Sequence, residues 1–284
     1  MTFMKKFMGK CLRLLGLFLI AVTLGLITLY FNQEKLVFHP TPIAQDHSFK
    51  FASPFEEKNI EFTHQGKPVK INYLVFNSAS TMGTILYFHG NAGNLINCGE
   101  TADQIAQRTG WSVWMMDYPG FGKSSPDLAK NHLILLEMAE KFIGLIQNLE
   151  TKKPLVAYGR SLGSGIASMI AAKHPKISLI LETPYSSLAK IGHQMYPMLP
   201  ESFSRFDLDT LGGLRNLEDR HVLILHGDND QTIPVSHGRE LAQVSTQHRY
   251  VEFKGGDHDN LDSFALYWTE LELFLKSVAN GQPV

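Results

Sequence analysis

One serine of the chain lies in a sequence typical of an activated nucleophile. Gly159-Arg160-Ser161-Leu162-Gly163 follows the apolar run Leu155–Tyr158 and opens a helix-length stretch. A strand, a tight turn and a helix in this order form an elbow that lifts a serine above the end of a sheet. The glycines let the strand and the helix meet while the serine takes a strained backbone conformation. The alternative interpretation is a glycine-rich turn without chemistry.

A serine hydroxyl is a weak nucleophile near neutral pH and needs a general base. Among the twelve histidines, His258 is our candidate because it follows the last predicted strand, Tyr250–Phe253. His226 and His89 also follow strands, but the glycine after each favours a role in a turn. We therefore expect His258 to accept the proton of Ser161.

The base in turn needs a carboxylate that orients it. Two aspartates follow the predicted strand Val222–Leu225, between the serine and the histidine in chain order. We favour Asp230, at which the loop has turned back over the sheet. Asp228 is the alternative, and otherwise it caps the loop.

The oxyanion of an acyl-transfer intermediate needs backbone donors. One is the N–H of Leu162, directly after the nucleophile. The loop after the predicted strand Thr84–Phe88 should supply the other, which we assign to the N–H of Asn91, with Ala92 as the alternative. No CxxC or HExxH spacing occurs, and the aspartates around His258 lack a second histidine nearby, so we expect neither a metal nor another cofactor.

The hydrophobic pattern predicts the strands and helices that position these residues. Apolar runs that alternate with helix-length stretches favour an α/β fold with a mostly parallel central sheet and helices on both faces. Residues 59–63 and 69–76 should form a hairpin before it. Predicted strands are Thr84–Phe88, Ser112–Met116, Leu155–Tyr158, Ile177–Leu181, Val222–Leu225 and Tyr250–Phe253. Predicted helices are Leu95–Thr109, Asp127–Leu149, Leu162–Lys173, Val235–Val244 and Asp262–Val278.

The alternation breaks between Tyr185 and Asn216, which we interpret as a minimal cap that runs over the sheet edge. This segment carries Met195, Tyr196 and Met198. Methionines adapt to flexible chains, so these residues could line a groove for an acyl chain. Equally well, they could simply cover the edge of the sheet.

The stretch Leu14–Phe31 is free of charged residues and would span about 27 Å as a helix, close to the hydrocarbon thickness of a bilayer. We interpret it as an uncleaved anchor. A signal peptide would need small residues before a cleavage point, and a core helix would need a polar face. The basic flank Lys5, Lys6, Lys10 and Arg13 places the N-terminus in the cytoplasm.

Domain organisation and localisation follow from this anchor. Residues 1–31 form the basic flank and anchor, residues 32–58 a tether and entry loop, and residues 59–284 the catalytic domain. The domain would then be extracytoplasmic, on the periplasmic side of a bacterial inner membrane. Cys11 and Cys98 would lie in different compartments and form no disulfide. Because 26 basic residues balance 27 acidic ones, we expect no nucleic-acid partner.

Over about residues 58–280 the sequence resembles the α/β-hydrolase superfamily. It is most similar to small membrane-tethered serine hydrolases related to eukaryotic protein depalmitoylases. This resemblance implies the α/β-hydrolase fold, with Ser161 as nucleophile, Asp230 as acid and His258 as base. It is carried, in order, by Phe88–Asn94 (FHGNAGN), Asp117–Ser124 (DYPGFGKS), Gly159–Gly165 (GRSLGSG), Glu182–Ser187 (ETPYSS), His226–Pro234 (HGDNDQTIP) and Gly255–Asn260 (GGDHDN).

These features together predict a membrane-anchored serine hydrolase. It would cleave carboxylic acyl esters or thioesters through an acyl-enzyme intermediate, and its partners would be that substrate and the membrane. Two alternatives stay open: a hydrolase of small peptides, and a catalytically silent binding domain tethered to the membrane.

Overall fold

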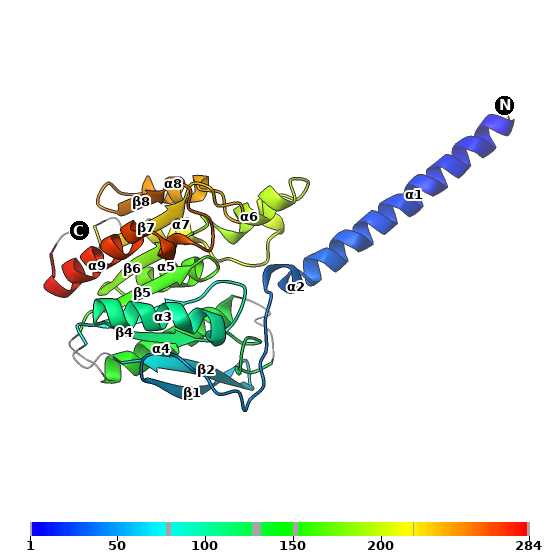
Figure 1. The fold of residues 1–284 in the computed structure, drawn as a ribbon. Helices are drawn as coiled ribbons and strands as arrows, with labels where there is room; N and C mark the ends of the chain where they lie inside the picture. The colour runs from blue at the N-terminus through cyan, green and yellow to red at the C-terminus, as the bar shows by residue number, and fades with distance from the viewer. Residues whose placement is uncertain (1, 78–80, 127–131, 150–152, 218, 283–284) are drawn as a thin grey trace.

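The computed structural model describes residues 2–77, 81–126, 132–149, 153–217 and 219–282 (Figure 1). Within these residues one eight-stranded sheet has the order β1-β2-β4-β3-β5-β6-β7-β8. The first two strands are antiparallel and the other six are parallel, which confirms the predicted fold class. The strands are β1 (Phe55–His64), β2 (Lys67–Phe76), β3 (Thr84–Phe88), β4 (Ser112–Met116), β5 (Leu155–Arg160), β6 (Ile177–Glu182), β7 (Val222–Gly227) and β8 (Arg249–Phe253).

The strand order places a topological switch between β3 and β5. After β3 the chain crosses to β4 on one side, and β5 then pairs with β3 on the other. Ligands of such sheets bind outside the carboxyl ends of the strands at this point. The turn after β5 carries Ser161 and the loop after β3 carries Asn91, so two of the predicted site segments meet there.

Three central strands extend one or two residues beyond their apolar runs. Arg160 at the end of β5 pairs with Glu182 at the end of β6, and His226 near the end of β7 pairs with Glu252. The backbone ladder therefore continues through polar residues, which the hydrophobic pattern does not signal.

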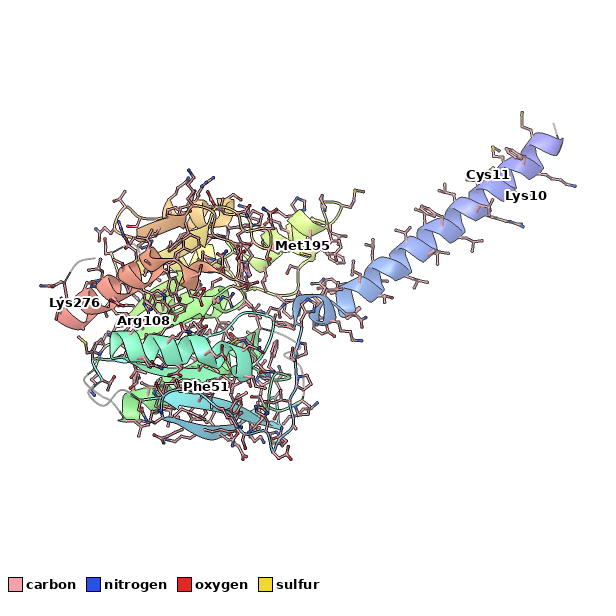
Figure 2. All side chains as sticks on the ribbon, in the orientation of Figure 1. Lys10, Cys11, Phe51, Arg108, Met195 and Lys276 are labelled. Carbon is pink, nitrogen blue, oxygen red and sulfur yellow. The ribbon has the colours of Figure 1, made fainter. Side chains whose placement is uncertain are left out.

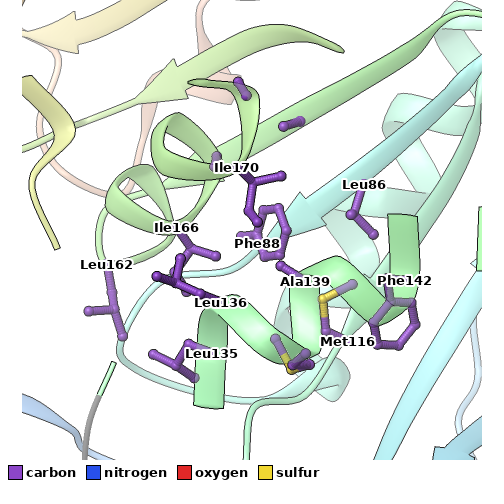
Figure 3. Close-up of a cluster of buried hydrophobic side chains, with 14 of the residues drawn as sticks. Leu86, Phe88, Met116, Leu135, Leu136, Ala139, Phe142, Leu162, Ile166 and Ile170 are labelled. Carbon is purple, nitrogen blue, oxygen red and sulfur yellow. The ribbon is translucent and has the colours of Figure 1, made fainter. Parts of the chain in front are cut away.

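Helices cover both faces of the sheet, because neighbouring strand residues point to opposite sides. Leu86 and Phe88 of β3 pack in one cluster with α4 and α5, and Figure 3 shows part of this layer. Ile85 and Tyr87 pack in a second cluster with α3 and α9. The helices of the domain are α3 (Leu95–Thr109), α4 (Leu133–Leu149), α5 (Gly163–Lys173), α6 (Leu188–Met195), α7 (Thr210–Leu214), α8 (Ser236–Ala242) and α9 (Ala265–Asn280), with 3-10 turns η1 (Glu201–Phe203) and η2 (Leu261–Ser263).

Helix α9 begins three residues later than predicted, and the predicted start of α4 cannot be compared. The start predicted for α4, residues 127–131, lies outside the described residues. The predicted start of α9 at Asp262 falls in the 3-10 turn η2, and Phe264 after it is extended with ψ 130°. The α-helix therefore begins only at Ala265.

The N-terminal helix α1 (Thr2–Phe31) projects away from the domain (Figure 1). Residues 6–31 are long and apolar enough to cross a membrane, and none of the most apolar part is buried. By length and composition α1 fits a membrane anchor or a signal sequence.

The connection to the domain is not a free chain. It begins with the short helix α2 (Glu34–Val37), after which Phe38 is buried with its ring centroid 5.2 Å from that of Phe206. Further along, Phe49 is buried in the cluster of α3 and α9. The strand β1 then begins at Phe55, four residues before the predicted hairpin.

Candidate active site

Ser161 occupies a sharp turn between β5 and α5. Its φ is 50°, a left-handed conformation that costs energy for a residue with a side chain. A Cβ at Gly159 would collide with the carbonyl oxygen of Gly163, and one at Gly163 would collide with that of Phe88. Both glycines of the motif are therefore required by close backbone approach, and the strained serine lies at the end of the sheet.

Ser161, His258 and Asp230 form a hydrogen-bonded relay. The Oγ of Ser161 lies 3.0 Å from Nε2 of His258, and Nδ1 of His258 lies 2.8 Å from Oδ2 of Asp230. The carboxylate accepts at Nδ1, so Nδ1 carries the proton and Nε2 is left to accept one from the serine. The three side chains come from the carboxyl ends of β5, β8 and β7.

The Asp230 carboxylate is buried and fully partnered. Its Oδ1 accepts from the amides of Thr232 and Ile233, each at 2.8 Å, and Nε2 of His226 lies 3.3 Å from Oδ2. Burial alone raises the pKa of Asp230, but the hydrogen bonds from His226, His258 and Ile233 outweigh it and hold that pKa well below its usual range. Asp230 is therefore ionised at neutral pH and can stabilise a positive charge on His258.

Asp228, the alternative acid, has another partner. Its Oδ1 accepts a hydrogen bond of 2.6 Å from the amide of Gly255. This bond joins the loops after β7 and β8, which makes Asp228 a loop-capping residue in the structure.

The side chain of Asn91 connects the loop after β3 to the chain that leaves α1. Its Nδ2 donates to the carbonyl oxygen of Val37, and its Oδ1 accepts a 3.0 Å hydrogen bond from the amide of His39. Among the described residues, the backbone amides of Asn91 and Leu162 donate to no other backbone group, so both can donate to a ligand. From the sequence we predicted only the backbone N–H of Asn91, as a donor to the oxyanion. The contact of its side chain with residues 37–39 was not predicted.

A buried pair of ionisable residues, His89 and Asp117, lies beneath the loop after β3. Nε2 of His89 lies 3.6 Å from Oδ1 of Asp117, which also accepts a 3.0 Å hydrogen bond from the amide of Leu95. Burial lowers the pKa of His89 to about 4 and raises that of Asp117 to about 8. Burial therefore favours the neutral form of both side chains beneath the loop.

Arg160 joins the nucleophile turn to the histidine loop. Its Nη2 donates to the carbonyl oxygen of His258 at 3.0 Å and to Asp259 at 2.5 Å, while Nε lies 3.3 Å from Oε1 of Glu182. Oε2 of Glu182 in turn accepts from the hydroxyl of Tyr158. The sequence did not indicate this role, because the partners of Arg160 lie far away along the chain.

The three residues expected to line an acyl groove lie on the surface. Met198 is 95 % exposed, Met195 67 % and Tyr196 47 %. An acyl chain that reached them would therefore lie on the domain, not inside it. Within the part of the chain that the structure describes, no group of three or more His, Cys, Asp or Glu is placed to hold a metal ion.

Comparisons with known proteins agree with the fold. The family model described as alpha/beta hydrolase fold matches residues 83–217. Protein bem46 of Schizosaccharomyces pombe is 26% identical over 230 residues, which cover 77% of each chain. The lysophosphatidylserine lipase ABHD12 of Danio rerio is 30% identical over 195 residues, 59% of this chain and 48% of the lipase.

A solved structure supports the fold. The esterase Pf2001 of Pyrococcus furiosus superposes with a TM-score of 0.65 over 84% of this chain and 97% of the esterase, at 16% identity. The chain has the α/β-hydrolase fold, and its sequence is similar to bem46 and to the ABHD proteins.

Proposed function

We propose that the protein is a membrane-anchored serine hydrolase that cleaves carboxylic acyl esters or thioesters. The observation that carries the proposal is the relay Ser161–His258–Asp230, with hydrogen bonds of 3.0 and 2.8 Å at the carboxyl end of the sheet. The names of two similar proteins, a lysophosphatidylserine lipase and an esterase, favour an ester as the substrate class.

The geometry supports acyl transfer in two steps, formation of an acyl-enzyme and its hydrolysis. Oγ of Ser161 attacks the carbonyl carbon while Nε2 of His258 takes its proton, and the amides of Leu162 and Asn91 donate to the oxyanion. His258 returns the proton to the departing alcohol or thiol, which leaves an acyl group on the serine. Water then attacks this ester and loses its proton to His258, which returns that proton to Oγ of Ser161 as the acyl–oxygen bond breaks and the carboxylic acid leaves. Asp230 stabilises the imidazolium in both steps.

A serine-directed probe tests the mechanism. A fluorophosphonate should label the full-length protein, and Ser161→Ala should abolish the labelling, because only an activated serine reacts. A panel of acyl esters, thioesters and short peptides then ranks the substrate classes. No labelling of the folded wild-type protein would instead favour a silent binding domain, and faster cleavage of peptides would favour a peptidase.

The membrane part of the proposal rests on α1 and its flank. Lys5, Lys6, Lys10 and Arg13 precede the apolar stretch with no acidic residue among them, which favours a cytoplasmic N-terminus and an extracytoplasmic domain. A reporter that is active only outside the cytoplasm, fused after residue 284, should be active. Activity of a reporter that works only in the cytoplasm would overturn this orientation.

A further inference from the structure

The segment that follows α6 is bonded to the end of α1. Nε2 of Gln33 donates a 2.8 Å hydrogen bond to the carbonyl oxygen of Phe203, and Oε1 of Gln33 accepts one of 2.9 Å from the amide of Arg205. The rings of Tyr30 and Phe203 meet edge to face at 5.4 Å. These contacts join residues 203–205 to the point where α1 reaches the domain.

Arg205 adds a second set of contacts at the same place. Its guanidinium lies 5.6 Å from the ring centroid of Tyr30 and 5.8 Å from that of Phe31. It also lies 3.8 Å from the Glu34 carboxylate. Tyrosine, phenylalanine and arginine at the end of an apolar helix are typical of the interface between lipid tails and headgroups.

Next to this junction the domain exposes an apolar tip, which we define as Met195, Tyr196 and Met198. All three are exposed, Met198 almost completely, and they lie within four residues of one another. Figures 1 and 2 show α6 and Met195 on the side of the domain from which α1 projects. Lys190 of α6 is paired with Glu240, and Glu201 follows the tip, so the surroundings carry charges of both signs. Exposed apolar side chains next to an apolar helix suit the interface of a bilayer better than water.

We propose that the apolar tip enters the interfacial layer of the bilayer and forms a second membrane contact beside α1. This inference rests on the membrane anchoring proposed above. The junction through Gln33 and Arg205 keeps the tip close to the place where α1 leaves the lipid. Methionine side chains adapt to disordered acyl chains, and the hydroxyl of Tyr196 can remain among the headgroups.

A second contact also fixes which end of the domain faces the lipid. One helix alone lets a domain swivel, whereas two contacts hold it in one orientation. The chain that leaves α1 bonds to the side chain of Asn91, in the loop opposite Ser161 at the switch point. The active-site end is therefore held near the bilayer, and acyl chains that remain partly embedded in lipid become the expected substrate class.

The depth of single labelled side chains tests this contact in the full-length protein. Met198→Cys, in a Cys11→Ser background, carries an environment-sensitive fluorophore in nanodiscs of phosphatidylcholine and phosphatidylglycerol. Burial raises the pKa of the Cys98 thiol to about 11, so that thiol reacts slowly with the dye. Nitroxide groups near the headgroup end of the acyl chains serve as quenchers. Leu24→Cys in α1 and Leu273→Cys in α9 are the matched controls, since α9 lies away from α1 (Figure 1).

We expect the labels at positions 24 and 198 to be quenched several-fold more strongly than the label at 273. If the label at position 24 is quenched but the label at position 198 is as accessible to water as the label at position 273, the second contact is overturned. The anchoring by α1 then still holds. A label at 24 that is not quenched would overturn the anchoring itself, and the second contact with it. Thermal unfolding of each labelled protein verifies that it is folded.

Discussion

At the residue scale, Asp230 and Asp228 show how two aspartates of one loop have different roles. Asp230 contacts His258, while Asp228 caps the amide of Gly255. We predict that Asp230→Asn lowers kcat by about 10⁴-fold, because the amide cannot hold the required histidine tautomer.

The matched variant Asp228→Asn should keep kcat within a few-fold of wild type and lose only part of one loop hydrogen bond. Steady-state kinetics on a soluble short-chain ester, with thermal unfolding of both variants, makes the comparison. If Asp228→Asn silences the enzyme and Asp230→Asn is mild, the assignment of the acid is wrong.

Asn91 gives a second prediction at this scale. Removing an oxyanion donor typically costs 10²–10³-fold in kcat, but Asn91→Ala keeps the backbone donor and removes only the side-chain bonds to Val37 and His39. We therefore expect a smaller loss, about tenfold in kcat on a soluble ester. Asn91→Asp retains an acceptor for the His39 amide but turns a carboxylate oxygen towards the carbonyl oxygen of Val37 and adds a negative charge near the oxyanion, so it should lose at least as much. Unchanged kcat with a lower unfolding temperature would show that the side chain only stabilises the fold.

The sequence predicted the relay residues because each one lies in the turn or loop that follows a strand, and the carboxyl ends of parallel strands meet. It could not predict the side-chain contacts of Asn91 or Arg160. The partners of Asn91 lie more than fifty residues away in the chain, and two of the partners of Arg160, His258 and Asp259, lie nearly a hundred residues away. Such contacts depend on tertiary packing, which leaves no local pattern in the sequence.

At the scale of elements, the ends of β5 and β6 position the histidine loop through Arg160. Its bond to the carbonyl oxygen of His258 runs from the turn of the nucleophile to the base. We predict that Arg160→Gln lowers kcat by about 10–100-fold with little change in KM, since small displacements of a catalytic group have effects of this size.

Asp259→Asn is the control for the same side chain. Asp259 is largely exposed, and surface ion pairs contribute only about 0–1 kcal/mol to the free energy of unfolding. The kcat of Asp259→Asn should therefore differ from that of the wild type by less than about threefold. Equal losses in both variants would place the effect in the Arg160–Asp259 pair and contradict a positioning role through His258.

The junction of α6 with α8 contains a buried histidine that makes stability depend on pH. The amide of Ser186 donates to Nδ1 of His237 at 3.2 Å, and Nε2 of His237 lies 2.9 Å from Oε1 of Gln194. Burial, followed by the charge of Lys190, lowers the pKa of His237 to about 4. The folded protein therefore favours the neutral imidazole, and its stabilisation is complete above about pH 6.5.

As the pH falls from about 6.5 to about 4, the unfolded chain takes up a proton that the folded His237 does not. The free energy of unfolding should decrease over this window by an amount on the order of 1–3 kcal/mol from this residue. Denaturant unfolding at several pH values should show a shallower decrease for His237→Gln, with the exposed His39→Gln as control. The same slope in His237→Gln and wild type would contradict this account.

Sequence periodicity predicted the elements themselves well but not their ends. Strands β5 to β7 continue through polar residues such as Arg160 and Glu182, which pair in the ladder although they are not apolar. At α9, the residues that read as a helix start form a 3-10 turn instead. Local hydrogen bonding decides these boundaries, and hydrophobicity does not report it.

At the scale of the whole molecule, the packing of residues 32–54 shortens the reach of the domain. Phe38 and Phe49 are buried, and Ile43 donates its amide to the carbonyl oxygen of Gly122. The chain after α1 is thus attached to the domain almost from its first residues. With α1 in a bilayer, the short connection would hold the active site at the membrane surface and prevent the domain from moving away from the bilayer.

Because of this geometry, we expect the anchor to raise the rate on membrane-embedded substrates but not on soluble ones. A protein without residues 1–31 keeps Gln33, Asn91 and the relay, so its kcat/KM on a soluble short-chain ester should stay within about threefold of the full-length value. On acyl substrates embedded in vesicles it should lose about 10²-fold or more, because tethering supplies a high effective concentration at the surface. A chimaera with an unrelated membrane-spanning helix in place of residues 6–31 should recover most of that rate. Equal rates of the full-length and shortened proteins on vesicles would contradict a substrate presented by the membrane, and so would a clear preference for free peptides.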